Sequence, residues 1–156
     1  MFLELDGWKT EVRFAAAHFI PSHDKCSRLH GHDYGVRARV HGVVKDSFIV
    51  DFLELRRIIL EIIDPIDHRV IVPIVDGISS HREEGNQVIV EYQGKKFSFF
   101  LPDVYYLNDT TSSSEALAKQ VGSKLWERLS PNENVSRIEL SIDEGPGMGA
   151  WVEIHR

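Results

Sequence analysis

Two stretches near the N-terminus alternate between apolar and polar positions, which is the pattern of half-buried strands. In residues 8–19, one side of an extended strand carries Trp8, Thr10, Val12, Phe14, Ala16 and His18. Residues 34–41 place apolar or aromatic side chains at every second position. A polar segment, 21–28, separates the two stretches. The pattern therefore predicts an antiparallel strand pair, joined by a long loop that carries several reactive side chains.

Two helices are predicted further along the chain. Apolar residues from Leu55 to Ile63 recur at the i, i+3, i+4, i+7 and i+8 spacing of a helix that buries one side, and Pro65 ends it. Ser112 followed by Glu115 is a capping-box pattern, and a second apolar stripe begins there. We expect both apolar stripes to lie on the sheet.

The remaining patterns predict more strands. Residues 135–143 and 150–154 form a second alternating pair, joined by a glycine-rich turn. Between the two helices, residues 88–92 and 96–100 flank a short Gln-Gly-Lys turn like a small hairpin, which interrupts the regular order. The order of elements indicates an α+β fold, with an antiparallel sheet, two helices on one face and an inserted hairpin.

Length and composition limit the number of domains and the classes of partner that we expect. The 156 residues suit a single domain, 1–156. The 24 acidic and 18 basic residues give a formal charge of −6, so we expect no nucleic-acid partner. No apolar run approaches the ~20 residues of a membrane span, and the N-terminus carries acids where a secretory signal carries positive charge. We therefore expect a cytoplasmic protein with no membrane partner.

Three histidines are candidates for one metal site. His30 and His32 are two residues apart, so in an extended chain both imidazoles face the same way. His18 leads into the loop that His30 closes, so antiparallel pairing can bring a third imidazole to the same point. Three neutral nitrogen ligands with an open fourth position are typical of catalytic zinc. Cys26 is an alternative fourth ligand, which would close the site and make it structural.

Other residues are candidates for chemistry beside this cluster. Cys26 is the single cysteine, so it cannot form an intramolecular disulfide and its thiol is free to react. Asp67 and His68 can help it act as a base if the fold brings them to it. Glu144 ends a predicted strand, where a buried carboxylate suits a ligand with two parallel N–H donors, such as a pterin or guanine. The serines at 112–114 are interpreted first as a helix cap.

These motifs together resemble one known family. The chain is similar to the 6-pyruvoyl tetrahydropterin synthase and 6-carboxy-tetrahydropterin synthase family over nearly its whole length. The resemblance rests on His18, Cys26-x3-His30-Gly31-His32-x-Tyr34, Asp67-His68, Ser113-Ser114-Glu115 and Glu144, in that order. It implies the tunnelling fold (T-fold), in which subunits join their sheets into a barrel, commonly a hexamer with active sites between subunits.

The resemblance also implies a role for each motif. Zn²⁺ would be held by His18, His30 and His32. Cys26 would be the general base, with Asp67 and His68 completing its relay. Glu144 would anchor the pterin ring, and Ser113 and Ser114 would contribute to binding the substrate. The implied substrate is 7,8-dihydroneopterin triphosphate, which a lyase of this family converts without an external redox cofactor.

The product remains open between two family activities. The three-residue gap between Cys26 and His30 resembles the 6-carboxy enzymes, which cleave the side chain to 6-carboxy-tetrahydropterin, acetaldehyde and triphosphate on the route to deazapurine nucleosides such as queuosine. The alternative is a 6-pyruvoyl synthase, which eliminates triphosphate. From other classes, a non-catalytic pterin- or purine-binding protein and a structural zinc domain are also open.

The chain departs from the family pattern in one long segment. The stretch from about 70 to 107 is much longer than the usual link between the Asp-His pair and the second helix. We interpret it as an insertion that contacts a neighbouring subunit or decorates the surface, rather than one that covers the pocket. Triphosphate would need nearby cations, and Lys25, Arg28 and Arg69 are the candidates by proximity to the motifs.

Overall fold

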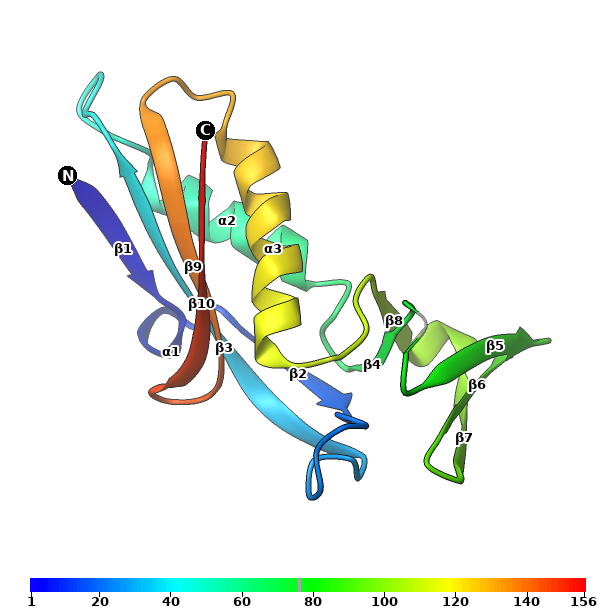
Figure 1. Ribbon diagram of the computed structural model, residues 1–156. Helices are drawn as coiled ribbons and strands as arrows, with labels where there is room; N and C mark the ends of the chain where they lie inside the picture. The colour runs from blue at the N-terminus through cyan, green and yellow to red at the C-terminus, as the bar shows by residue number, and fades with distance from the viewer. Residues whose placement is uncertain (76) are drawn as a thin grey trace.

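The computed structural model describes residues 1–75 and 77–156, and its central feature is a mixed sheet that two helices cover on one face (Figure 1). In these residues the main sheet has seven strands: β1 (Phe2–Asp6), β2 (Arg13–His18), β3 (His30–Gly42), β4 (Arg69–Pro73), β8 (Val104–Leu107), β9 (Val135–Gly145) and β10 (Met148–His155). Their order is β10-β9-β3-β2-β4-β8, and β1 also pairs with β3. The predicted α+β class is confirmed.

The two predicted helices are α2 (Phe52–Ile63) and α3 (Ser114–Leu129). The predicted stripe on α2 is buried: Leu55, Ile58, Ile59, Ile62 and Ile63. Asp51 begins α2 by accepting hydrogen bonds from the first free backbone N–H groups, those of Leu53 and Glu54. Both helices pack their apolar sides against the sheet, where one large core cluster forms.

The first predicted strand is shorter than the alternation suggested. Residues Gly7–Thr10 form a short helix, α1, which Asp6 caps by accepting from the Trp8 N–H. Glu11 then takes a left-handed conformation, with φ at 56°, and β2 begins at Arg13. Both β1 and β2 pair with β3, so α1 is an interruption between two strands that share one partner.

The sheet is antiparallel from β10 to β2, as predicted, and two parallel pairings extend it. β4 pairs parallel with β2, and β8 pairs parallel with β4. Neither β4 nor β8 was predicted, because parallel partners lie far apart in the chain and leave no local turn signature. β4 and β8 occupy the two ends of segment 70–107, and the rest of that segment lies between them.

The part of the segment between β4 and β8 forms a second, three-stranded sheet, which projects from the main sheet in Figure 1. It contains the predicted hairpin, β6 (Gln87–Tyr92) and β7 (Lys95–Phe100), together with an unpredicted strand, β5 (Ser80–Glu84). A 3-10 turn, η1 (Leu101–Asp103), leads back to β8. The small sheet has its own apolar cluster, which includes Phe19, the residue that follows β2.

Candidate functional site

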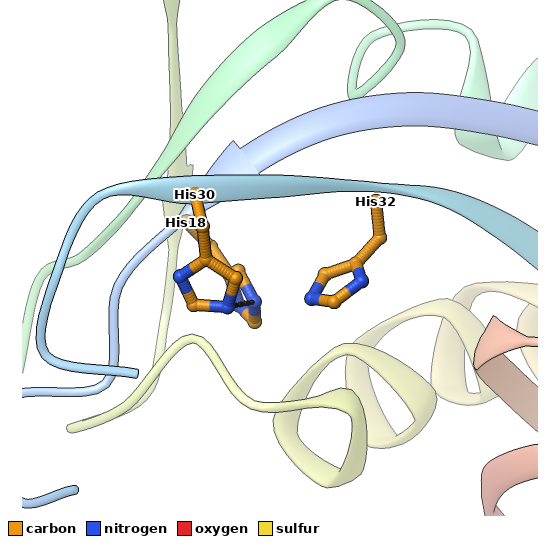
Figure 2. Close-up of side chains that lie close together, drawn as sticks. All are labelled: His18, His30 and His32. Carbon is orange, nitrogen blue, oxygen red and sulfur yellow. Dashed lines mark hydrogen bonds between the residues drawn. The ribbon is translucent and has the colours of Figure 1, made fainter. Parts of the chain in front are cut away.

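Three imidazoles converge at the ends of β2 and β3. His18 is opposite His30 in the antiparallel register, and His32 lies two residues further along β3. Figure 2 shows the three rings on the same side of β3, turned toward one another. Each ring offers a nitrogen, and these nitrogens all lie within 4.8 Å of one another. The convergence that the spacing predicted is therefore present.

Backbone carbonyls fix the orientation of two of the rings. His18 Nδ1 is 2.6 Å from the carbonyl oxygen of Ser112, and His30 Nδ1 is 2.7 Å from that of Arg28. Carbonyl oxygens only accept hydrogen bonds, so each Nδ1 carries the proton and donates. In the neutral rings, both Nε2 atoms then present lone pairs, and this is the usual arrangement of metal-binding histidines.

These lone pairs face each other at a distance that needs a cation. His18 Nε2 and His30 Nε2 are 3.1 Å apart (Figure 2). A shared proton is one way to join them, but burial of the His18 ring lowers its pKa to about 4, which disfavours that proton at neutral pH. Tetrahedral zinc, with Zn–N bonds of about 2.0–2.1 Å, separates its nitrogen ligands by about 3.3 Å. The pair therefore fits a divalent metal.

The third imidazole supports the same fit. His32 Nε2 is buried and has no hydrogen-bond partner among the described residues. Glu144 completes the surroundings, since its two carboxylate oxygens lie 3.8 Å from His18 Nε2 and from His32 Nε2. An unpaired buried imidazole nitrogen next to a carboxylate is costly without a cation. The three imidazole nitrogens form a donor set that suits zinc, with the Glu144 carboxylate close to it.

Cys26 lies in the wall of a cavity beside this cluster. The cavity has a volume of about 390 Å³, and its lining is Lys25, Cys26, Arg28, Leu29, His30, His32 and Glu144. In the part of the chain that the structure describes, the close group of candidate ligands contains the three histidines and leaves Cys26 out. The geometry thus favours an open metal site with a neighbouring thiol over a closed site with sulfur as the fourth ligand.

The Asp67-His68 pair lies elsewhere. Asp67 accepts a hydrogen bond from the Ala15 N–H at 2.8 Å, and His68 Nδ1 is 2.9 Å from the same carboxylate. The His68 side chain is 82% exposed and faces a different hollow, of about 550 Å³, next to β2. Within one chain, the structure does not bring this pair to the cavity of Cys26.

The serines before α3 have separate positions. Ser113, rather than Ser112, is the N-cap, and its side chain accepts from the Ala116 N–H. Ser112 is buried, and its hydroxyl donates to the Phe19 carbonyl at 2.6 Å while its own carbonyl accepts from His18. The sequence analysis missed this support for His18, because a main-chain acceptor leaves no mark on residue type.

Two of the three candidate cations for triphosphate lie at the cavity. Lys25 and Arg28 are in its lining, beside Cys26. Arg69 lies instead at the hollow that His68 faces, where its guanidinium donates to the Pro102 carbonyl.

Comparison with known proteins agrees with this fold and shows the family. The family model described as 6-pyruvoyl tetrahydropterin synthase matches residues 8–155. The chain therefore belongs to the 6-pyruvoyl tetrahydropterin synthase family. Its fold is the T-fold of that family: the solved 6-pyruvoyl tetrahydropterin synthase of Plasmodium falciparum superposes with a TM-score of 0.91 and 25% identity, over 100% of this chain and 98% of the other.

Two curated relatives carry more specific names. A Methanocaldococcus jannaschii protein, provisionally named a 6-carboxy-5,6,7,8-tetrahydropterin synthase, is 32% identical over 154 residues, which are 96% of this chain and 94% of the relative. A Pyrococcus furiosus protein named dihydroneopterin monophosphate aldolase is 32% identical over 64 residues, which are 41% of this chain and 55% of the relative. Within the described residues, none of the helices has the length and apolar character of a membrane span.

Proposed function

We propose that the protein is a zinc-dependent 6-carboxy-5,6,7,8-tetrahydropterin synthase, a lyase acting on 7,8-dihydroneopterin triphosphate in a deazapurine (queuosine-type) pathway. One observation carries the proposal: the Cys26 thiol shares a cavity with two of three convergent imidazoles and with Glu144. Family membership supports a pterin substrate, and the Methanocaldococcus relative supports the 6-carboxy product. The cytoplasmic location expected from the sequence belongs to the same proposal.

In this proposal His18, His30 and His32 hold the zinc ion. When bound, zinc supplies a Lewis acid that polarises an oxygen of the substrate side chain. The chain's own contribution is to hold the rings: two Nδ1–H groups donate to carbonyls, so the Nε2 atoms stay aimed at one point.

Cys26 acts as the general base in this proposal. Its place in the cavity wall lets it take a proton from a side-chain carbon of a substrate bound there. Asp67 and His68 complete its relay. Since they face a different hollow of the same chain, the relay needs a neighbouring subunit, which agrees with the oligomer and the intersubunit sites that the resemblance implies.

The substrate is held by the other polar groups. Glu144 accepts two parallel N–H donors from the pterin ring, which is the geometry that a carboxylate offers. Ser113 and Ser114 lie at the start of α3, near the ring of His18 that Ser112 supports. Lys25 and Arg28 line the cavity and provide positive charge for the triphosphate.

A second candidate function is aldol cleavage of the pterin side chain. The observation that favours it is the likeness to the Pyrococcus protein named dihydroneopterin monophosphate aldolase, although the match covers 41% of this chain. Both reactions need a base beside the side chain, so the same cavity serves either one. The longer Methanocaldococcus match leads us to prefer the synthase.

One experiment distinguishes these functions. The zinc-loaded protein is incubated separately with dihydroneopterin triphosphate and with dihydroneopterin monophosphate, and products are identified by mass spectrometry. Acetaldehyde with a 6-carboxy pterin supports the proposal. A 6-pyruvoyl pterin supports the alternative synthase, and glycolaldehyde phosphate supports the aldolase. Pterin binding without any product, unchanged in Cys26→Ala, would overturn the enzyme assignment in favour of a binding protein.

A further inference from the structure

The end of the small sheet contacts the loop that carries Cys26. Tyr92, the last residue of β6, donates from its hydroxyl to the Ser27 carbonyl at 2.6 Å. Lys95, the first residue of β7, donates from Nζ to the same carbonyl at 3.0 Å and to the Ser27 hydroxyl oxygen at 3.1 Å. Ser27 directly follows Cys26, so two side chains of the inserted sheet hold the backbone beside the thiol.

The same turn also holds the other end of the loop. The Gln93 side-chain amide donates to the Pro21 carbonyl at 2.6 Å. The loop closes on itself, because the Ile20 N–H donates to the Cys26 carbonyl at 2.7 Å. Three residues of one hairpin end, Tyr92, Gln93 and Lys95, therefore contact both ends of the loop. Figure 1 shows the β6–β7 turn beside the connection from β2 to β3.

The part of this contact that Tyr92 makes is buried. Tyr92 is 3% exposed and stacks on Phe19, with ring centroids 4.8 Å apart. Phe19 directly follows His18, so the stack ties the small sheet to the strand that carries a candidate metal ligand. Ser27 is also buried, and a buried carbonyl that loses its hydrogen-bond donors costs free energy. The contact is therefore held by hydrogen bonds as well as by packing.

We propose that the β6–β7 end is a clamp that positions Cys26 for the reaction, with Tyr92, Gln93 and Lys95 as positioning residues. The insertion, expected from the sequence to contact a neighbour or decorate the surface, thus acts on the active-site loop of its own chain. Among the described residues, Tyr92 and Lys95 are not in the cavity wall, so they act through the loop. The catalytic half of this inference rests on the proposed role of Cys26; the structural half does not.

The test compares three single variants of the zinc-loaded full chain and the double variant Tyr92→Phe/Lys95→Met. Tyr92→Phe removes one hydroxyl and keeps the ring stack, and Lys95→Met removes the ammonium. Lys96→Met is the matched control, since the Lys96 ammonium approaches Glu91 at 3.7 Å and lies on the other side of the strand. Backbone hydrogen exchange of peptides covering 20–28 is measured by mass spectrometry, together with kcat and KM for dihydroneopterin triphosphate.

We expect exchange in 20–28 to rise about fivefold in Tyr92→Phe and in Lys95→Met, the factor by which one net hydrogen bond shifts a local opening equilibrium. We expect kcat to fall by a similar factor at unchanged KM, with zinc content equal to that of Lys96→Met. Unchanged exchange in the double variant Tyr92→Phe/Lys95→Met would overturn the clamp. Faster exchange at unchanged kcat would overturn its positioning role. If the wild type turns over no pterin, the exchange data still decide the clamp, so the two failures are distinguishable.

Discussion

His18 and Ser112 are joined by a 2.6 Å hydrogen bond between a ring nitrogen and a main-chain carbonyl that lies 94 residues further along the chain. This bond sets the tautomer of His18, because Nδ1 must carry the proton. It also links the start of α3 to the end of β2. The candidate metal site is therefore a product of tertiary packing between a helix and a strand, and its properties can be tested one group at a time.

The first prediction concerns metal content. Replacing His30 or His32 by alanine should reduce bound zinc from one equivalent per chain to a small fraction, because each supplies one of three nitrogens to a shared point. His155→Ala is the matched control, since His155 is exposed near the C-terminus, away from the cluster. Elemental analysis of the purified proteins measures the ratio. Full zinc retention in both variants would contradict the three-histidine site.

The second prediction separates base from ligand at Cys26. Cys26→Ala should keep its zinc and lose about 10²–10⁴ in kcat, the contribution typical of a positioned general base. The same elemental analysis and a product assay measure both quantities. If the substitution removes the metal instead, sulfur is a ligand and the catalytic assignment fails.

The third prediction concerns removal of the metal. A chelator should abolish turnover and leave the far-ultraviolet circular dichroism unchanged, because the main core packs between the sheet and the two helices without using the site. Restoring zinc should restore activity. Unfolding on chelation would instead support a structural zinc domain.

The fourth prediction concerns pH and the metal-free protein. Burial lowers the pKa of His18 from its ordinary 6.5 to about 4, so between these values the unfolded chain binds the proton and the folded chain does not. Stability contributed by the neutral ring is complete above pH 6.5 and is lost as pH falls toward 4, by roughly 3 kcal/mol in all.

Urea unfolding of the chelated protein at several pH values from 7.5 to 4 measures this loss. His18→Asn is the comparison, because asparagine has no proton to gain in this range and can still donate to the Ser112 carbonyl. The difference in stability between the two proteins should shrink as pH falls. Parallel pH profiles for both would contradict the assignment.

The fifth prediction distinguishes the two serines at the start of α3. Ser113→Ala should cost about 1 kcal/mol of unfolding free energy, because the Ser113 side chain caps the helix. Ser114→Ala should cost much less, since it lies inside the first turn. Chemical denaturation measures the difference. A role for Ser114 in binding would appear separately, as a raised KM at unchanged stability.

Much of the fold was predictable because it depends on local patterns. The α2 stripe, the β6–β7 hairpin and the C-terminal strand pair each follow from spacing within a few residues. The helix α1 was not predictable from alternation, since Trp8 fits a strand pattern and its helical turn depends on the Asp6 cap. The strands β4 and β8 were missed because their parallel partners are distant in the chain.

The candidate site, like the fold, was predictable only where it depends on local patterns. The sequence by itself determined that His30 and His32 face one way and that an antiparallel partner could add His18, because the period of two along a strand is a local property. Only the tertiary structure decided that Ser112 orients His18 and that the Asp67-His68 pair faces a different hollow from Cys26. It also decided that the inserted sheet donates hydrogen bonds to the loop that carries Cys26. The His18–Ser112 and Tyr92–Ser27 contacts join residues that are dozens of positions apart through backbone carbonyls, which every residue carries alike, so residue type alone cannot specify them.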